Sequence, residues 1–192
     1  MKSKHQTSAG MPEWDDRDIV RYSKDAIKQD LACKVLVEKY KERLYWHIRK
    51  LVISHDDADD VLQNTFIKAW KGLKEFREDS KLYTWLYRIA TNEALTFLKQ
   101  RKSNRFVAWE DAQHALSETV ESDAYFNGSE IQKKLQKAIH TLPEKQRLVF
   151  NMKYFEEFKY EEIADILETS VGALKASYHH AVKKIEAYFE SD

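Results

Sequence analysis

The sequence has few of the residues that bend or cross-link a protein chain. Its 192 residues include 4 Gly, 2 Pro and 1 Cys. Few Gly and Pro argue against a turn-rich all-β fold, a collagen-like chain and a glycine-cradled nucleotide site. Because Cys33 stands alone, the chain has no disulfide framework and no multi-cysteine metal site. A helical protein is the class that remains.

Long hydrophobic runs are also missing. No stretch approaches the ~18 consecutive apolar residues that a membrane span needs, and the polar residues 1–6 lack the apolar core of a signal peptide. We therefore expect a cytoplasmic protein without membrane insertion. The apolar share of 43% is still enough to build packed cores.

Positive and negative charges balance in total but are separated along the chain. Residues 1–105 carry 22 basic and 16 acidic side chains, and residues 131–192 carry 10 of each. Residues 106–130 carry 6 acidic side chains and no Lys or Arg. Such blocks predict interaction surfaces, because net charge acts on partners more than on packing.

Apolar residues recur every three or four positions in the first half of the chain, which predicts helices with one buried face each. These helices are expected from Ile19 to about Val52, after the acidic run 56–60, and from about Ser80 to Arg101. The acidic run suits the start of a helix, because the unpaired amides there attract anions.

The stretch 103–129 breaks this rhythm, which predicts a linker, because long aperiodic segments are uncommon inside one domain. We therefore expect an all-α protein of two small helical domains joined by a flexible acidic linker. The expected parts are a disordered tail over 1–12, an N-terminal domain over 13–104, the linker over 105–129 and a C-terminal domain over 130–192.

The C-terminal domain has the pattern of a helix-turn-helix. A helical segment at Tyr160–Leu167 and a longer one from Val171 are joined by a short polar turn, in which Ser170 suits the N-cap position. Such a pair of helices either binds DNA or serves as a plain structural hairpin, and the pattern alone leaves both open.

The aspartates at positions 56, 57, 59 and 60 are the most enzyme-like feature. Such a run can hold magnesium in all-helical synthases, yet magnesium also needs carboxylates from another helix and substrate phosphates. The sequence has no second aspartate-rich run. His179 and His180 are adjacent, so their side chains diverge by ~100° on a helix and do not share a metal easily. We predict no metal, no cofactor and no catalytic residue.

Nucleic-acid signals are stronger on the third predicted helix. Arg88, Asn92 and Lys99 fall within about 40° of one another at ~100° per residue, and Tyr83 and Trp85 stand close by. Rings stack on unpaired bases while cations hold phosphates. Four other apolar residues already supply the buried face, so at least one ring is expected to face outward. The competing interpretation places the rings in the core and the charges in solvent.

The last predicted helix carries a second set of candidate DNA contacts opposite its apolar face. Small residues let the backbone approach base edges, while His, Ser and Lys side chains can contact bases or phosphates. The set is Lys175, Ala176, Ser177, His179, His180, Lys183 and Lys184.

Two parts of the chain resemble the extracytoplasmic-function (ECF) sigma factors of bacterial RNA polymerase. The first is residues 57–70, DADDVLQNTFIKAW, followed by 83–92, YTWLYRIATN. The second is residues 142–150, LPEKQRLVF, with YEEIA at 160–164 and SVGALK at 170–175. The resemblance covers roughly residues 15–104 and 130–188, in the order that the family has.

The resemblance implies a sigma factor that binds core RNA polymerase, directs it to specific promoters and promotes their melting. It implies that four residues contact the clamp helices of the largest polymerase subunit, namely Asp57, Asp60, Gln63 and Asn64. The single-stranded minus-ten element is read by Tyr83, Trp85, Arg88, Asn92 and Lys99. The last helix reads the minus-thirty-five element as duplex, and the polymerase flap is a further contact. Whether an anti-sigma factor exists is left open.

The last helix also departs from the family pattern. Ser177, His180 and Val182 stand where members usually carry arginines, so base preference does not transfer from relatives. A free-standing helix-turn-helix regulator is the alternative function; it would dimerise and bind a palindrome without polymerase. A magnesium-dependent helical synthase is the third possible function. It would need a second acidic run, which this sequence does not have.

Overall fold

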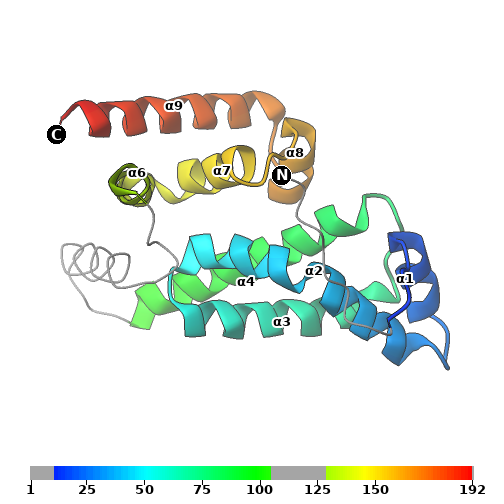
Figure 1. Cartoon of the computed structure of the whole chain (residues 1–192). Coiled ribbons are helices and arrows are strands. Elements are labelled where there is room, and N and C mark those ends of the chain that lie inside the picture. Colours follow the sequence, from blue (N-terminus) through cyan, green and yellow to red (C-terminus); the bar gives the residue numbers. More distant parts are fainter. Residues whose placement is uncertain (1–10, 105–128, 192) are drawn as a thin grey trace.

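A computed structural model describes residues 11–104 and 129–191 of the chain (Figure 1). These residues contain eight helices and no strand. The N-terminal half comprises α1 (Asp16–Ser23), α2 (Gln29–Val52), α3 (His55–Leu73) and α4 (Leu82–Asn104). The C-terminal half comprises α6 (Glu130–Thr141), α7 (Glu144–Tyr154), α8 (Tyr160–Leu167) and α9 (Val171–Glu190). The all-α prediction is confirmed, whereas most of the expected tail and linker lies outside the described residues.

The first predicted helix is in fact two helices. One helix was expected from Ile19 to about Val52, but α1 ends at Ser23 and α2 begins at Gln29. The carboxylate of Asp25 accepts hydrogen bonds from the N–H groups of Ile27 and Lys28, at 2.9 and 3.0 Å. These two bonds lower the pKa of the Asp25 carboxyl. An aspartate side chain thus satisfies backbone groups outside a helix, and the helix is interrupted.

The aspartate run lies within α3 rather than before it. Ser54 is the N-cap residue, and its hydroxyl accepts a hydrogen bond from the N–H of Asp57 at 3.4 Å. Asp56 and Asp57 occupy the first turn. The expectation that the helix opens after residues 56–60 is therefore wrong by nearly two turns, because α3 already begins at His55. Acidic side chains still lie where the helix dipole favours them.

The predicted helix-turn-helix is confirmed at α8 and α9. Glu168 ends α8 in the left-handed conformation, with φ 50° and ψ 48°, and this reverses the chain within a short turn. The Ser170 hydroxyl then accepts a hydrogen bond from the N–H of Ala173 at 3.3 Å, as expected of an N-cap.

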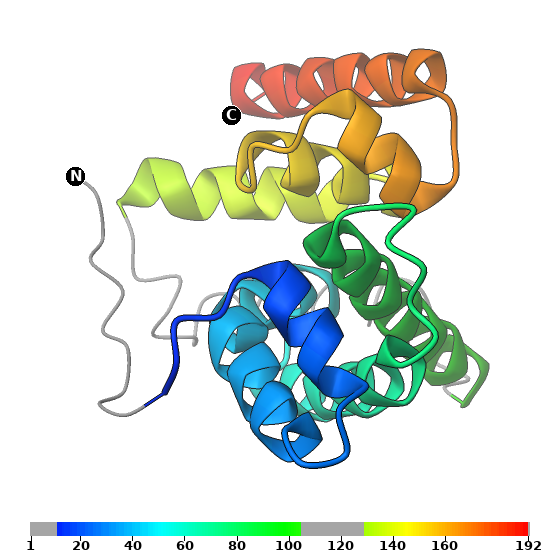
Figure 2. The same ribbon diagram turned by 90° about the vertical axis from the view of Figure 1, so that its right-hand side faces the viewer.

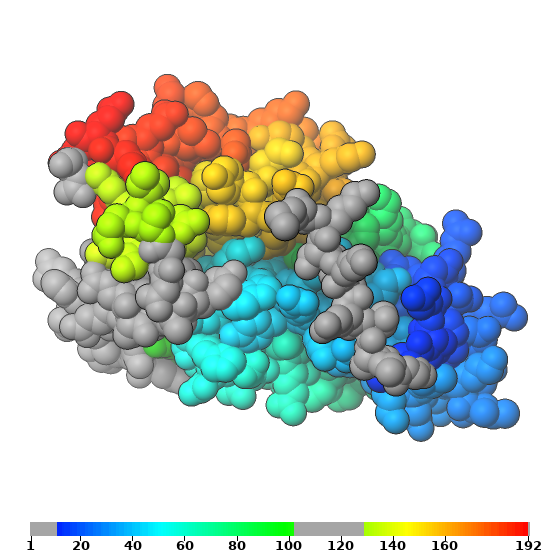
Figure 3. Space-filling view, in the orientation of Figure 1, coloured from blue at the N-terminus to red at the C-terminus, as the bar shows by residue number. Residues whose placement is uncertain are grey.

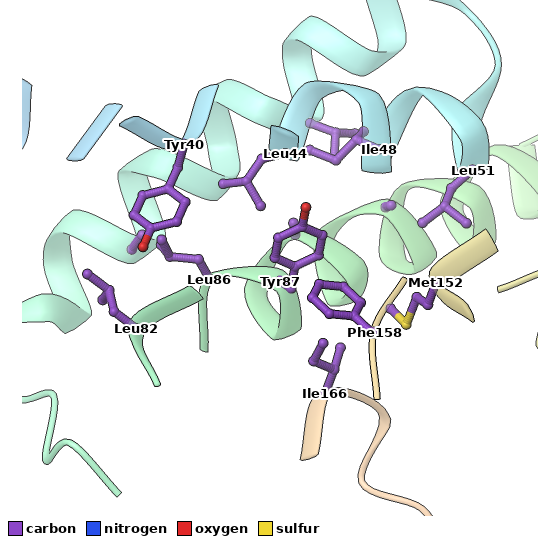
Figure 4. Close-up of a cluster of buried hydrophobic side chains, with 14 of the residues drawn as sticks. Tyr40, Leu44, Ile48, Leu51, Leu82, Leu86, Tyr87, Met152, Phe158 and Ile166 are labelled. Atoms are coloured by element: carbon purple, nitrogen blue, oxygen red, sulfur yellow. The ribbon is translucent and has the colours of Figure 1, made fainter. Parts of the chain in front are cut away.

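The two halves of the molecule share an apolar core. Helices α7 and α8 lie against α2 and α4 (Figures 1 and 2), and in the view of Figure 3 the atoms of α7 lie directly on those of α2. Leu51 and Tyr87 from the N-terminal half are buried in one cluster with Met152, Phe158 and Ile166 from the C-terminal half (Figure 4). Because apolar burial stabilises by roughly 25 cal/mol per Å², this seam holds the halves together.

A smaller apolar cluster belongs to the C-terminal half alone. It joins α6, α7 and α9, so it fixes the long last helix on the other helices of this half. Its buried members are Ala138, Ile139, Leu142, Phe150, Ala181 and Ile185.

Candidate polymerase and DNA interfaces

One face of α3 carries the candidate polymerase contacts. Asp60, Gln63 and Asn64 are exposed, while Ala58, Val61, Thr65 and Ala69 bury the opposite side against the core. Asp57 differs from the other three candidates because it is half-buried. Its Oδ2 atom lies 2.7 Å from Nη1 of Arg101, near the end of α4. The structure therefore brings three predicted side chains together on an open face and engages the fourth in an ion pair.

The first turns of α4 are covered by the C-terminal half. The hydroxyl of Tyr83 donates a hydrogen bond to Glu162 of α8, and its ring stacks on Phe158 with centroids 5.9 Å apart and planes 6° apart. Burial, followed by the bond to Glu162, raises the pKa of Tyr83. Two of the groups that cover this face are thus an aromatic ring and a carboxylate.

Arg88, one turn further along α4, also contacts α8 and its C-terminal end. Its Nη2 atom donates to the backbone carbonyl oxygen of Asp165 at 2.5 Å, and its Nη1 atom lies 3.4 Å from Oε1 of Glu168. The Arg88 guanidinium could bind a phosphate, but here it binds carboxylate and carbonyl oxygens of its own chain.

The expectation that Tyr83 or Trp85 faces freely outward is wrong, because both rings are half-buried. The indole of Trp85 packs on Phe76, with ring centroids 5.1 Å apart. It also lies so close to Gly72 that a Cβ atom there would come within 3.1 Å of the indole Cζ2 atom. Glycine at position 72 thus provides the space that the indole occupies.

The remaining candidates on α4 are open to solvent. Asn92 and Lys99 are exposed. The five predicted minus-ten residues therefore do not form one continuous accessible face: two are exposed, Trp85 packs on its neighbours, and Tyr83 and Arg88 lie under α8.

On α9 the predicted DNA-contacting set faces outward. Six of its seven residues are exposed, namely Lys175, Ala176, His179, His180, Lys183 and Lys184. Ser177 is half-buried. The opposite side of the helix packs inward through Leu174, Ala181 and Ile185, and α9 lies along the edge of the molecule that faces away from the N-terminal half (Figure 1).

Sequence reasoning missed a polar cluster buried at the seam. His47 of α2 is 1% exposed; its Nδ1 lies 3.0 Å from Oε1 of Glu156, and its Nε2 lies 2.9 Å from Oγ1 of Thr91. The Nζ atom of Lys50 lies 3.6 Å from the same glutamate oxygen, and burial lowers the pKa of Lys50. Because His47 and Glu156 are 109 positions apart, only the packing of the halves brings them together.

The part of the chain that the structure describes has neither a metal-binding cluster nor a membrane-spanning helix. Over residues 11–104 and 129–191, no three His, Cys, Asp or Glu side chains converge on a point where they could hold a metal ion. No helix in these ranges is both long enough and apolar enough to span a bilayer.

Two family models match the chain, one in each half. Residues 36–104 match sigma-70 region 2, which spans most of α2, all of α3 and all of α4. Residues 132–185 match sigma-70 region 4, which begins in α6 and ends in α9.

Curated proteins of similar sequence are sigma factors. The RNA polymerase sigma-H factor of Pseudomonas aeruginosa is 34% identical over 163 residues, which cover 81% of this chain and 84% of that protein. The ECF RNA polymerase sigma-E factor of Escherichia coli K12 is 32% identical over 163 residues, which cover 81% of this chain and 85% of that protein.

Two solved structures share the fold. CnrH in complex with the cytosolic domain of CnrY aligns with a TM-score of 0.66 and 24% identity, over 92% of this chain and 98% of that one. The sigma factor RpoE from Bartonella quintana, in complex with the anti-sigma factor NepR, aligns with a TM-score of 0.63 and 22% identity, over 85% of this chain and 99% of that one.

Together, the two matched regions and the curated relatives define the class of protein. The chain belongs to the ECF sigma factors of the sigma-70 family. It is accordingly a transcription initiation factor, which binds core RNA polymerase and directs it to promoters. The alternative of a free-standing helix-turn-helix regulator is not favoured by these matches.

Proposed function

We propose that three helices of this sigma factor make its contacts with polymerase and promoter DNA. The exposed face of α3 binds the clamp helices of the largest polymerase subunit, α4 opens and reads the minus-ten element as a single strand, and α9 reads the minus-thirty-five element as duplex. In this proposal residues 13–104 and 130–192 act as the two domains, and the acidic residues 105–129 are the linker between them. The chain takes part in initiation without catalysing a reaction itself.

The single observation that carries the proposal is the open outer face of α9. A recognition helix must present small and hydrogen-bonding side chains to the major groove while its other side is anchored. On α9 the exposed Ala176 and His180 lie between lysines, while Leu174 and Ile185 anchor the inner side. This arrangement supports DNA binding by α9 rather than a plain structural hairpin.

Run-off transcription with core polymerase on a library of genomic promoters tests the overall function. Transcripts that depend on the added chain, and that share an upstream element, are the expected result. His180→Ala is expected to change the preference among upstream elements, because a side chain that contacts a base edge carries sequence information. Transcription that is unaltered by changes on α9 would remove this helix from promoter reading.

Co-purification with tagged core polymerase tests the α3 assignment. Asp60→Lys is expected to weaken the complex, because it reverses a charge on the exposed face. The effect of a single surface charge is modest, about 1 kcal/mol or less. Glu75→Lys is the matched control, since Glu75 is exposed shortly after α3 ends. Equal retention of both variants would argue against the α3 contact.

Two further partners belong to the proposal. The flap of the polymerase is the expected contact of the C-terminal half, and an anti-sigma factor is included because the Bartonella quintana relative was solved with one. The acidic linker suits polymerase channels that otherwise hold nucleic acid, since its carboxylates can take the place of phosphates. With these partners, the proposed place of action is the cytoplasm, where core polymerase is found.

A further inference from the structure

Helices α3 and α4 lie side by side and run antiparallel (Figure 1). Ion pairs between them join the start of α3 to the end of α4 and the later part of α3 to the middle of α4. Asp57 in the first turn of α3 contacts Arg101 near the end of α4. Further along α3, Lys68 contacts Glu93 of α4. These contacts hold the two helices in one register.

The ion pair between Asp57 and Arg101 is well formed. Oδ2 of Asp57 lies 2.7 Å from Nη1 of Arg101, and the two side chains are 25% and 37% exposed. The backbone N–H of Asp57 donates to the Ser54 hydroxyl. Both the backbone amide and the carboxylate of Asp57 are therefore bound within this chain, and the carboxylate accepts a charge-assisted hydrogen bond.

This ion pair lies between the two surfaces of α3 and α4 that are proposed to bind polymerase and DNA. Asp57, Asp60 and Asn64 follow one another at spacings of three and four, so they share a side of α3. Asp60 and Asn64 are exposed, and so is Lys99, two residues before Arg101. The ion pair thus joins the end of the polymerase-binding face to the part of α4 that carries a candidate minus-ten contact.

We propose that Asp57 is a positioning residue, which acts on polymerase binding and promoter melting through Arg101 and does not itself contact the clamp helices. The inference rests on the proposed roles of α3 and α4. Because Lys99 and Gln100 are exposed, Arg101 is the next residue of α4 that reaches back to α3. When either charge is lost, the two helices slide against each other, and the polymerase-binding and minus-ten surfaces lose their alignment.

Exchange of the two charges distinguishes positioning from direct contact. Asp57→Arg and Arg101→Asp are compared singly and together by co-purification with tagged core polymerase. Each single reversal is expected to weaken the complex up to about five-fold, as one partly exposed ion pair allows, and the double variant is expected to bind as the native chain does. A double variant as weak as Asp57→Arg would overturn the proposal, and so would native binding by Arg101→Asp alone.

Promoter melting at a saturating concentration of the chain separates alignment from affinity. Permanganate footprinting measures the fraction of open promoters once all core polymerase is bound. The single reversals are expected to lower this fraction, and the double variant to restore it. Asp56→Arg is the matched control, because it makes the same charge change at an exposed residue of the same turn. Equal melting by Asp56→Arg and Asp57→Arg would overturn the proposal.

Uncharged variants keep the test decisive if a reversed charge prevents folding, which circular dichroism detects. Asp57→Asn, Arg101→Gln and the double variant form a cycle in which two residues that act through each other give equal, non-additive losses of polymerase affinity. Additive losses would overturn the proposal. Asp60→Lys separates the two proposals: if it binds polymerase normally while the charge exchange still restores melting, the α3 contact fails and the positioning role stands.

Discussion

Helices α4 and α9 carry comparable sets of side chains and are used differently in the structure. Both combine cationic and hydrogen-bonding residues on a face away from their own apolar stripe. On α9 that face is open, whereas the first turns of α4 are covered by α8 through Tyr83 and Arg88. Periodicity thus identifies which side of a helix is polar but does not reveal whether another part of the chain covers it.

The difference follows from the position of α8. This helix contacts α4 on one side and α7 and α9 on another. Its Ile163 and Ile166 are buried in the cluster that spans both halves. Because α8 lies between α4 and α9 and uses both of its sides, it supports the inner side of α9 and covers the outer side of α4.

Trp85→Ala is expected to have the largest effect, on the covered side of the comparison. The indole packs on Phe76 and Gly72, so its removal leaves a void and should lower the free energy of unfolding by about 3 kcal/mol. Urea denaturation followed by circular dichroism measures this loss. Trp85→Phe is the control that retains part of the packing. Unchanged stability together with lost promoter melting would instead assign the ring to DNA.

Acidification is expected to weaken the fold through His140 of α6. Burial, with help from Arg147 and Arg49, lowers the pKa of His140 to about 4. The unfolded chain, with an ordinary histidine pKa near 6.5, therefore binds this proton first as the pH falls. Stability contributed by His140 is present above about pH 6.5 and declines towards pH 4, by about 2 kcal/mol between pH 7 and pH 5.

Denaturation at pH 7 and pH 5, compared between the native chain and His140→Gln, isolates this contribution. Other titrating groups act on both proteins, so the difference between them reports His140. The native chain should lose more stability than the variant. Parallel losses in the two proteins would show that His140 is protonated equally well in the folded and unfolded states.

Ser170→Ala tests how well the open helix α9 is anchored at its start. The hydroxyl accepts the hydrogen bond from Ala173, and its loss should cost about 1 kcal/mol of stability. Ser170→Asp should restore most of that stability, because aspartate is an equally good cap. Thermal unfolding of the three proteins measures the effect. Equal melting temperatures for serine and alanine would show that the cap contributes nothing.

Lys183→Ala is expected to have the smallest effect, on the open side of the comparison. Loss of one phosphate contact should weaken binding to duplex upstream elements a few-fold, whatever their sequence. It should also reduce the slope of log affinity against log salt concentration by about 1. Lys145→Ala is the matched control, an exposed lysine on α7. Fluorescence anisotropy at several salt concentrations distinguishes them. Identical slopes for the two variants would place Lys183 outside the DNA contact.

Local features of the fold could be predicted well because they depend on neighbouring residues. The span Tyr160–Leu167 and the N-cap Ser170 follow from periodicity and from a hydrogen-bonding side chain next to the helix start. Predictions were wrong where local signals competed. Asp25 interrupts an apolar pattern that otherwise continues from α1 into α2, because its carboxylate bonds to nearby backbone amides.

The candidate site was predicted as residue types on helix faces, and this holds for α9 and for most of α3. It does not hold for Trp85, because the sequence contains no sign that Gly72 on the preceding helix makes room for the indole. It also does not hold for Tyr83 and Arg88, whose partners in α8 lie about 80 positions away.

The sequence by itself determined the helical class, the order of the two matched regions, the polar face of each candidate helix and the family resemblance. Those properties depend on composition and short spacings, which any helix expresses wherever it is packed. The tertiary structure alone decided that α8 covers α4, that Glu156 reaches His47 and that α9 stays open. These outcomes depend on how two halves dock, and docking follows from shape and buried apolar area contributed by residues far apart in the chain.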